Sequence, residues 1–167
     1  MSLVKLILLG ILLSSLLACG YQLRGLQGGN FELAVSSVAI TGSRQDRDLL
    51  RLLSQRLEQS GVTEQVDAGS AEVELRIDRV TQSRRVLSVN ASSKVSEFEL
   101  HYAVDYVLKP ANGQEVRRNA SSRRDITFDE DQVLAKAEEE SRLYDEMRGD
   151  VVNTMLRVLQ RTTAVAQ

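Results

Sequence analysis

A strict alternation of apolar and polar residues between positions 97 and 108 constrains the fold of this chain more than any other feature. One set of alternate positions holds Phe98, Leu100, Tyr102, Val104, Tyr106 and Leu108, and the other holds Glu97, Glu99, His101 and Asp105. Successive side chains of a β-strand point to opposite faces, so the pattern predicts a long strand with one buried and one solvated face. The buried face requires a sheet and a covering apolar layer.

Neighbouring segments supply partners for this strand. Residues 71–80 also alternate, but the parity slips at Val80, which predicts a β-bulge near Arg79. Residues 84–90 extend this strand toward a short polar turn. After the turn at 109–113, residues 114–128 return as a partner strand, so a long hairpin is expected.

Two helices and one further strand complete the expected order. A short strand lies within residues 31–40, and Ser43 or Asp46 caps a leucine-rich helix that ends at Gly61. Residues 129–131 supply negative charge at the start of a second, long helix. Its expected apolar face comprises Val133, Leu134, Ala137, Tyr144, Met147, Val151, Met155, Val158 and Leu159. The predicted fold is α+β, a four-stranded mixed sheet with both helices on one face, in the order β-α-β-β-β-α.

The first 19 residues indicate an export signal and a lipid anchor. One lysine precedes a twelve-residue apolar run, Leu6–Leu17, which is too short to span a membrane. The following Leu-Ala-Cys resembles the bacterial lipobox, in which the cysteine is acylated and becomes the first mature residue. We therefore expect residues 1–18 to be a signal peptide and Cys19 to be the lipidation site. A plain signal peptide with an incidental cysteine, or a buried free thiol, is the alternative, and the absence of aspartate after Cys19 favours the outer membrane.

The expected mature chain forms a single domain. Removal of 18 residues from the 167 leaves 149, with a formal charge of −3 because the signal carries one lysine and no acid. We expect a lipidated tether at 19–30, one domain at 31–163 and a short tail at 164–167. The small charge and the absence of tryptophan disfavour nucleic-acid binding, and a single cysteine leaves no intrachain disulfide.

Catalytic and metal-binding residues are not assembled in the sequence. His101 is the only histidine, and although Asp105 shares its strand face, no nucleophile accompanies the pair. A solvent-facing polar residue is the simpler interpretation of His101. Because the only cysteine is assigned to the anchor, no metal set remains. We therefore expect neither an enzyme nor a cofactor or metal.

Basic residues are the remaining chemical feature. Arg84, Arg85 and Lys94 flank one turn, and the pairs Arg117-Arg118 and Arg123-Arg124 lie in the last strand. Adjacent arginines in a strand point to opposite faces, so neither pair forms a single clamp. Either a mixed solvated surface or contact with an anionic ligand or partner explains them.

The residues after the lipobox resemble the start of the mature LptE (RlpB) family of lipopolysaccharide-assembly lipoproteins. Cys19-Gly20-Tyr21-Gln22-Leu23-Arg24-Gly25 matches the family's opening of Cys-Gly, an aromatic residue, a polar residue and Leu-Arg. The likeness continues through Ser96-Glu97-Phe98 and Val133-Leu134-Ala135-Lys136, and it covers nearly all of residues 19–160.

This resemblance implies a function, a partner and a site. Members of the family plug the LptD outer-membrane barrel, assist its assembly, and bind lipopolysaccharide for insertion in the outer leaflet. The family's lysine in Leu-Ala-Lys corresponds to Lys136, and its second basic position falls at Ala91, with Lys94 nearby as a candidate substitute. A structural lipoprotein of a peptidoglycan complex or another envelope assembly remains the alternative, and a periplasmic enzyme is disfavoured by the missing site.

Overall fold

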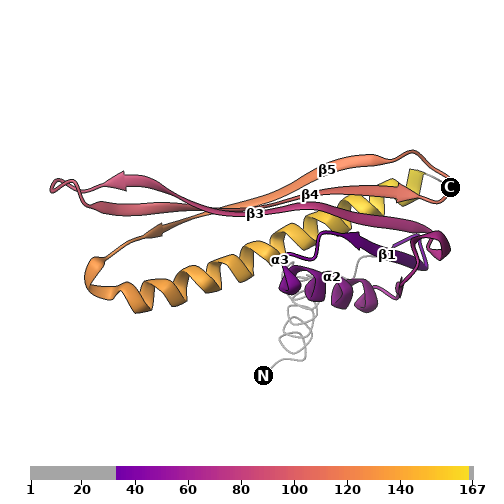
Figure 1. Ribbon diagram of the computed structural model, residues 1–167, viewed down its shortest axis with the longest axis horizontal. Helices are drawn as coiled ribbons and strands as arrows, with labels where there is room; N and C mark the ends of the chain where they lie inside the picture. The colour runs from indigo at the N-terminus through magenta and orange to yellow at the C-terminus, as the bar shows by residue number, and fades with distance from the viewer. Residues whose placement is uncertain (1–32, 166–167) are drawn as a thin grey trace, which may run out of the picture.

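The computed structural model describes residues 33–165 as one mixed sheet with both helices on the same face (Figure 1). The elements are β1 (Ser37–Gly42), α2 (Arg47–Gln59), β2 (Thr63–Gln65), η1 (Ala68–Ser70), β3 (Val73–Val89), β4 (Val95–Pro110), β5 (Val116–Thr127), η2 (Glu130–Gln132) and α3 (Val133–Val165). The sheet order is β2-β1-β3-β4-β5. β1 runs parallel to β2 and β3, and the other pairs are antiparallel. The predicted α+β class is confirmed.

The sheet has five strands, so the prediction of four was wrong in this detail. The additional strand, β2, is only three residues long and pairs in parallel with the start of β1. Three residues, Thr63, Glu64 and Gln65, are too few and too polar to produce an alternation that could be recognised in the sequence. β2 lies at the edge of the sheet, where a short polar strand is common.

The long hairpin extends well beyond α2 (Figure 1). β3 and β4 pair from Val73–Pro110 to Val89–Val95, and the register shifts between Ile77 and Arg79, where the bulge was predicted. We call the part of the sheet beyond this bulge the arm and the part before it the body. In the body β3 is flanked by both β1 and β4, whereas the arm contains only β3, β4 and β5.

The core lies between the sheet and the two helices, and it extends from the body into the arm as far as Leu100 of β4. The predicted apolar face of β4 is buried from Leu100 to Leu108, with Phe98 partly buried, and α2 contributes leucines that are fully inaccessible to solvent. The largest fully buried side chains include Tyr102, Tyr106, Leu49, Leu53, Leu57, Met147, Met155 and Leu156. Burial of a side chain of this size contributes about 1.5–3 kcal/mol, so this layer accounts for most of the stability of the fold.

The first turns of α3 do not join the core, contrary to the predicted apolar face. Val133 and Leu134 are 52% and 83% exposed, and the buried side chains of the helix begin at Tyr144. α3 continues through Gly149 without a break. The helix therefore covers the sheet with its C-terminal part, while its N-terminal turns lie at the far end of the arm (Figure 1).

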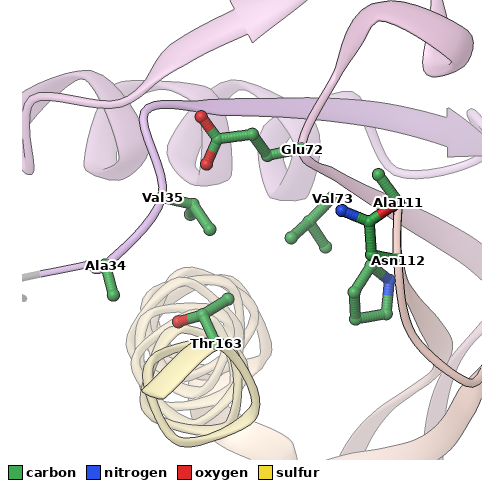
Figure 2. Close-up of a pocket in the computed structure, with 8 residues that line it drawn as sticks. Ala34, Val35, Glu72, Val73, Ala111, Asn112 and Thr163 are labelled. Atoms are coloured by element: carbon green, nitrogen blue, oxygen red, sulfur yellow. The ribbon is translucent and has the colours of Figure 1, made fainter. Parts of the chain in front are cut away.

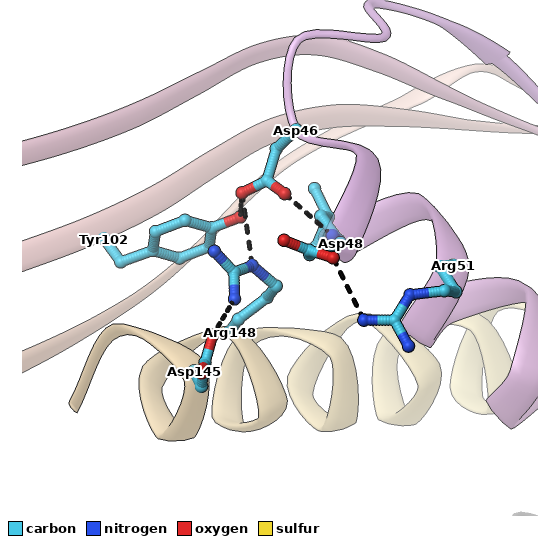
Figure 3. A network of polar contacts seen from close by, with 7 residues as sticks. Asp46, Asp48, Arg51, Tyr102, Asp145 and Arg148 are labelled. Atoms are coloured by element: carbon cyan, nitrogen blue, oxygen red, sulfur yellow. Dashed lines mark hydrogen bonds and ion pairs between the residues drawn. The ribbon is translucent and has the colours of Figure 1, made fainter. Parts of the chain in front are cut away.

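A polar network joins α2, β4 and α3 within this apolar layer (Figure 3). Asp46 caps α2 by accepting the Leu49 N–H at 2.8 Å, and it also accepts the Tyr102 hydroxyl at 2.7 Å and the Arg148 Nε–H at 3.2 Å. Arg148 donates a further bond to Asp145 at 2.6 Å. Burial of Asp46 raises its pKa, but the hydrogen bonds from Leu49, Tyr102 and Arg148 outweigh burial, so the pKa lies below its usual value.

Candidate functional site

Lys136, the basic residue implicated by the Leu-Ala-Lys motif, lies in the exposed first turns of α3. Its Nζ donates to Thr127 Oγ1 at the end of β5 at 3.0 Å and to Glu139 Oε2 at 2.9 Å. The side chain is only 18% exposed. Lys136 is therefore held in a fixed position between β5 and α3.

Lys94, the second predicted cation, lies in the turn between β3 and β4. Its Nζ forms an ion pair with Glu130 of η2, and the hydrogen bond to Glu130 raises the Lys94 pKa. Because η2 connects β5 to α3, the two lysines predicted from the sequence belong to the same end of the molecule. We call this the distal end: the turn 90–94, η2 and the first turns of α3.

Arg84 is a third cation on the approach to the distal end. Its guanidinium lies 4.4 Å from the centre of the Phe98 ring and donates to Glu140 of α3 at 2.9 Å. Phe98 in turn packs edge-to-face against Phe128, with the ring centres 5.3 Å apart. A cation above an aromatic face is stabilised by the quadrupole of the ring. The contact fixes Arg84 without burying it.

Exposed apolar side chains lie in the same two elements as Arg84 and Lys136, β3 and α3. Among the described residues, the large apolar side chains with high exposure are Val66, Val86, Leu87, Val89, Val133 and Leu134. All except Val66 belong to the arm's β3 segment or to the first turns of α3. Scattered single apolar residues on a surface are ordinary, but a group at one end of a molecule indicates a binding surface. The distal end thus places individual cations next to exposed apolar side chains, within a surface that also carries the acids Glu130, Asp131, Glu138 and Glu139.

Each of the three cations already has a glutamate partner. The pairs are Arg84 with Glu140, Lys94 with Glu130 and Lys136 with Glu139. The Lys94–Glu130 pair is more than half exposed on both sides, and ion pairs at a solvated surface contribute only about 0–1 kcal/mol, so exchange of this glutamate for a more highly charged anion costs little. A phosphate group accepts charge-assisted hydrogen bonds from lysine and arginine, and it is a suitable replacement.

Sequence reasoning identified the lysines of the distal end but missed its apolar part. Arg84 was noted only as a basic residue near a turn, and Val133 and Leu134 were assigned to the core. The clue for Val86 and Val89 was their position next to a polar turn, in a segment with no covering element. Exposure of the α3 residues depends on how far the helix overlaps the sheet, and periodicity does not contain that information.

A separate hollow lies at the opposite end of the molecule (Figure 2). It has a volume of about 260 Å³ and is lined by residues from the segment before β1, the start of β3, the β4–β5 turn and the end of α3, including Val35, Pro110 and Thr163. Its only carboxylate, Glu72, is occupied by the N–H of Ser36 at 3.1 Å. The hollow is therefore mainly apolar and carries no group poised for proton transfer.

The remaining residues with possible catalytic or metal-binding roles are not assembled into a site. His101 lies on the solvent-facing side of the sheet, and Asp105 accepts a hydrogen bond from Asn119 at 2.7 Å. Within residues 33–165, no group of three or more histidine, cysteine or acidic side chains could hold a metal. No helix in that part of the chain is long and apolar enough to cross a membrane. Cys19 lies outside the described residues.

Comparisons with known proteins identify a family and a shared fold. The family model of LptE, described as lipopolysaccharide-assembly, matches residues 32–159. No curated protein sequence gives a significant match.

Solved structures share the fold, and three of them illustrate the similarity. Rare lipoprotein B from Shewanella oneidensis superimposes with a TM-score of 0.70 at 27% identity, covering 78% of this chain and 98% of that one. Lipoprotein B from Nitrosomonas europaea gives 0.67 at 30% identity, covering 87% and 93%. A minor lipoprotein from Acinetobacter baumannii gives 0.64 at 21% identity, covering 78% and 94%, and supports the fold alone.

The family match covers most of the chain, and its limits enclose every strand of the sheet and all but the last residues of α3. On these grounds the chain belongs to the LptE family of lipopolysaccharide-assembly lipoproteins.

Proposed function

We propose that this lipoprotein is anchored in the outer membrane through Cys19, where it plugs the LptD barrel and assists its assembly. In this role it binds lipopolysaccharide at the distal end and helps to insert it in the outer leaflet. Family membership supports the assembly role, and the lipobox at Cys19 supports the anchor. The proposal assigns no catalytic step to the chain.

The observation that carries the ligand assignment is the combination of cations and exposed apolar side chains at one end of the molecule. Lys136, Lys94 and Arg84 supply positive charge, while Val86 and Leu134 supply apolar area. The lipid portion of lipopolysaccharide is complementary to this surface, since it carries anionic phosphates next to apolar acyl chains. Charge-assisted hydrogen bonds and apolar burial would both contribute to its binding.

The exposed face of the sheet suits the inside of a large barrel. The face opposite the helices carries arginines, acids and small polar residues, including the bidentate pair of Arg85 with Glu99 at 2.7 and 3.1 Å. The interior of an outer-membrane barrel is polar, so contacts between two polar surfaces are expected there.

Lys136→Asp tests the ligand assignment. Loss of a hydrogen bond between charged groups costs about 1.5–3 kcal/mol, so the affinity for purified lipopolysaccharide should fall roughly 10- to 100-fold. Lys109→Asp is the matched control, because Lys109 is exposed, lies at the other end of β4 and contacts Glu74 only at 4.0 Å. It should bind within about twofold of wild type.

A second variant tests the same site at a position where a loss of affinity cannot be attributed to unfolding. Leu134→Ser removes an exposed apolar side chain that contributes nothing to the core, so the thermal melt should match wild type while lipopolysaccharide affinity falls. Unchanged affinity in Lys136→Asp would remove that lysine from the site. An equal loss in Lys109→Asp would show that binding follows overall charge rather than the distal end.

The barrel assignment requires its own experiment. Affinity-tagged chain, extracted in detergent from cells that make the barrel, should copurify with it in a one-to-one complex. Recovery of peptidoglycan or of a different envelope complex, with no barrel, would instead favour the structural lipoprotein.

A further inference from the structure

β3 has an unpaired side along the arm. β1 pairs with β3 only from Val73 to Ile77, where β1 ends at Gly42 and the chain turns toward α2. Beyond that point none of the described residues forms a strand on this side of β3. The register with β4 is continuous from Arg79 to Val86. We call this eight-residue segment the β3 free edge.

The hydrogen bonds of the neighbouring strands show which groups of the free edge point outward. The Phe128 N–H donates to the Ser96 carbonyl at 2.8 Å, so even-numbered residues of β4 direct their backbone groups toward β5. Odd-numbered residues of β4 therefore face β3, because the direction alternates along a strand. The β3 residues paired with them form their backbone hydrogen bonds with β4. The backbone N–H and C=O groups that point outward, away from β4, therefore belong to Val80, Gln82, Arg84 and Val86.

The opposite edge of the arm is protected by side chains. On β5 the outward carbonyls belong to odd-numbered residues, and two of them accept from the guanidinium that follows. Arg118 Nη1 donates to the Arg117 carbonyl at 2.9 Å, and Arg124 Nη1 donates to the Arg123 carbonyl at 2.8 Å. Such capping hinders the addition of a further strand, and natural sheets commonly protect their edges with charged side chains. The two edges of the arm are therefore not equivalent.

The charge of the free edge restricts what can pair with it. Residues 79–86 contain three arginines and no acid. Arg79 forms no ion pair with any residue in the described part of the chain. A second copy of this chain would place arginines against arginines, which is unfavourable, whereas a segment with acidic side chains would be attracted.

Space for such a segment exists beside the edge. A polar hollow of about 400 Å³ opens between Gln82 of β3 and α3, and its charged lining comprises Asp48, Glu140, Asp145 and Arg148, so the inward side chains of an added strand would be neutral or basic there. Inward side chains of an added strand would enter this hollow. Its outward side chains would lie on the solvent face next to Arg79 and Arg85, where acidic residues are favoured.

We propose that the β3 free edge binds an extended acidic segment of the partner barrel, which joins the sheet as an additional strand. This inference rests on the proposed barrel complex and names the surface that forms it. Main-chain hydrogen bonds of the four outward residues would supply affinity, and the arginines would select the acidic segment.

A matched pair of proline variants tests the proposal. Gln82→Pro removes an outward N–H of the free edge, and Ser121→Pro removes an outward N–H of β5; both positions are exposed, and neither N–H bonds to β4. Proline is tolerated at edge positions of this kind. In detergent, Gln82→Pro should lower the affinity for the barrel roughly tenfold or more, whereas Ser121→Pro should remain within about twofold.

Amide hydrogen exchange of the wild-type complex gives an answer that does not depend on the folding of a variant. The N–H groups of Gln82 and Arg84 should exchange at least roughly tenfold more slowly in the complex than in the free chain. Those of Ser121 and Arg123 should be unchanged.

Three results would overturn the inference. One is a wild-type complex in which the Gln82 and Arg84 amides are not slowed, a result that would leave the barrel assignment intact. Another is a loss of affinity for the barrel in Ser121→Pro that equals the loss in Gln82→Pro. The third is slow exchange of the free-edge amides in the chain alone, together with a dimer in sedimentation, which would assign the edge to a second copy. If wild type recovers no barrel, the proposed function falls together with this inference.

Discussion

Asp46→Ala tests whether the polar network between α2, β4 and α3 stabilises the fold. The substitution removes the α2 cap, because the carboxylate no longer accepts the Leu49 N–H, and loss of such a cap costs about 1 kcal/mol. It also leaves the Tyr102 hydroxyl, on a side chain with no exposed surface, without its acceptor, which adds about 1–3 kcal/mol. Arg148 keeps Asp145 at 2.6 Å and contributes little further loss.

The expected total is a loss of about 3 kcal/mol in the free energy of unfolding, which corresponds to roughly 6–12 °C in Tm for a domain of this size. Urea denaturation of the mature chain, followed by circular dichroism at 222 nm, measures it directly. Asp48→Ala is the control, because Asp48 lies two residues away and pairs with Arg51 at 3.0 Å, but both side chains are largely exposed. Its cost should stay below about 1 kcal/mol.

The reasoning would be refuted if Asp46→Ala stayed within about 0.5 kcal/mol of wild type. It would also be refuted if Asp48→Ala cost as much, since solvated charge rather than the buried acceptor would then be responsible.

Three other predictions concern pH, a buried hydroxyl and two glycines. The folded-state pKa of Asp46 is depressed, so its contribution is complete above the unfolded-state pKa of about 3.9 and is lost as the pH falls through the folded value. The stability difference between wild type and Asp46→Asn should be constant above about pH 5 and shrink in acid titration of urea melts. Tyr106 has a buried hydroxyl with no hydrogen-bond partner in the described structure, and burial raises its pKa to about 12. Tyr106→Phe should therefore leave stability unchanged or raise it by about 1 kcal/mol in the same melts, and a loss would reveal an unseen partner. Gly42→Ala should cost more than about 2 kcal/mol, because the φ of Gly42 is +89° and a Cβ there would lie 2.2 Å from the Ile77 carbonyl oxygen. Gly61 has a φ of +76° but open space around it, so Gly61→Ala should cost only about 1 kcal/mol. Equal costs in thermal melts would contradict the steric argument.

The sequence predicted the long strands well because two-residue periodicity reports directly which side chains are buried. The alternation at 97–108 became β4, and the parity slip at Val80 marked the bulge. The N-terminal boundary of α2 also followed from local chemistry, since Asp46 is the cap. In each case the decisive interaction lies within a few residues of the pattern that predicts it.

Features that depend on distant contacts were not predictable. Asp46 was one of two candidate caps, with Ser43, but nothing in the sequence indicates that it also meets Tyr102 and Arg148, 56 and 102 residues away. For the same reason the exposure of Leu134 was missed, because it depends on how the long helix is placed beneath the sheet. Lys136 and Lys94 were selected as candidate site residues only through family likeness, since an isolated lysine carries no local signal, and their position at one end of the molecule was not predicted.

The bulge at Asp78 changes which alternate residues of β3 face the core. Before it, odd-numbered residues such as Val73 and Ile77 face the core, whereas beyond it the inward positions are even-numbered, as for Val80 and Gln82. A single inserted or deleted residue exchanges the two faces of everything on its far side. Relatives can therefore lengthen or shorten the arm by pairs of residues, but a change of one requires that the bulge be moved or lost. In an alignment of relatives, a length difference of an odd number of residues within β3 would therefore indicate that the bulge has shifted. A difference of an even number would indicate a longer arm.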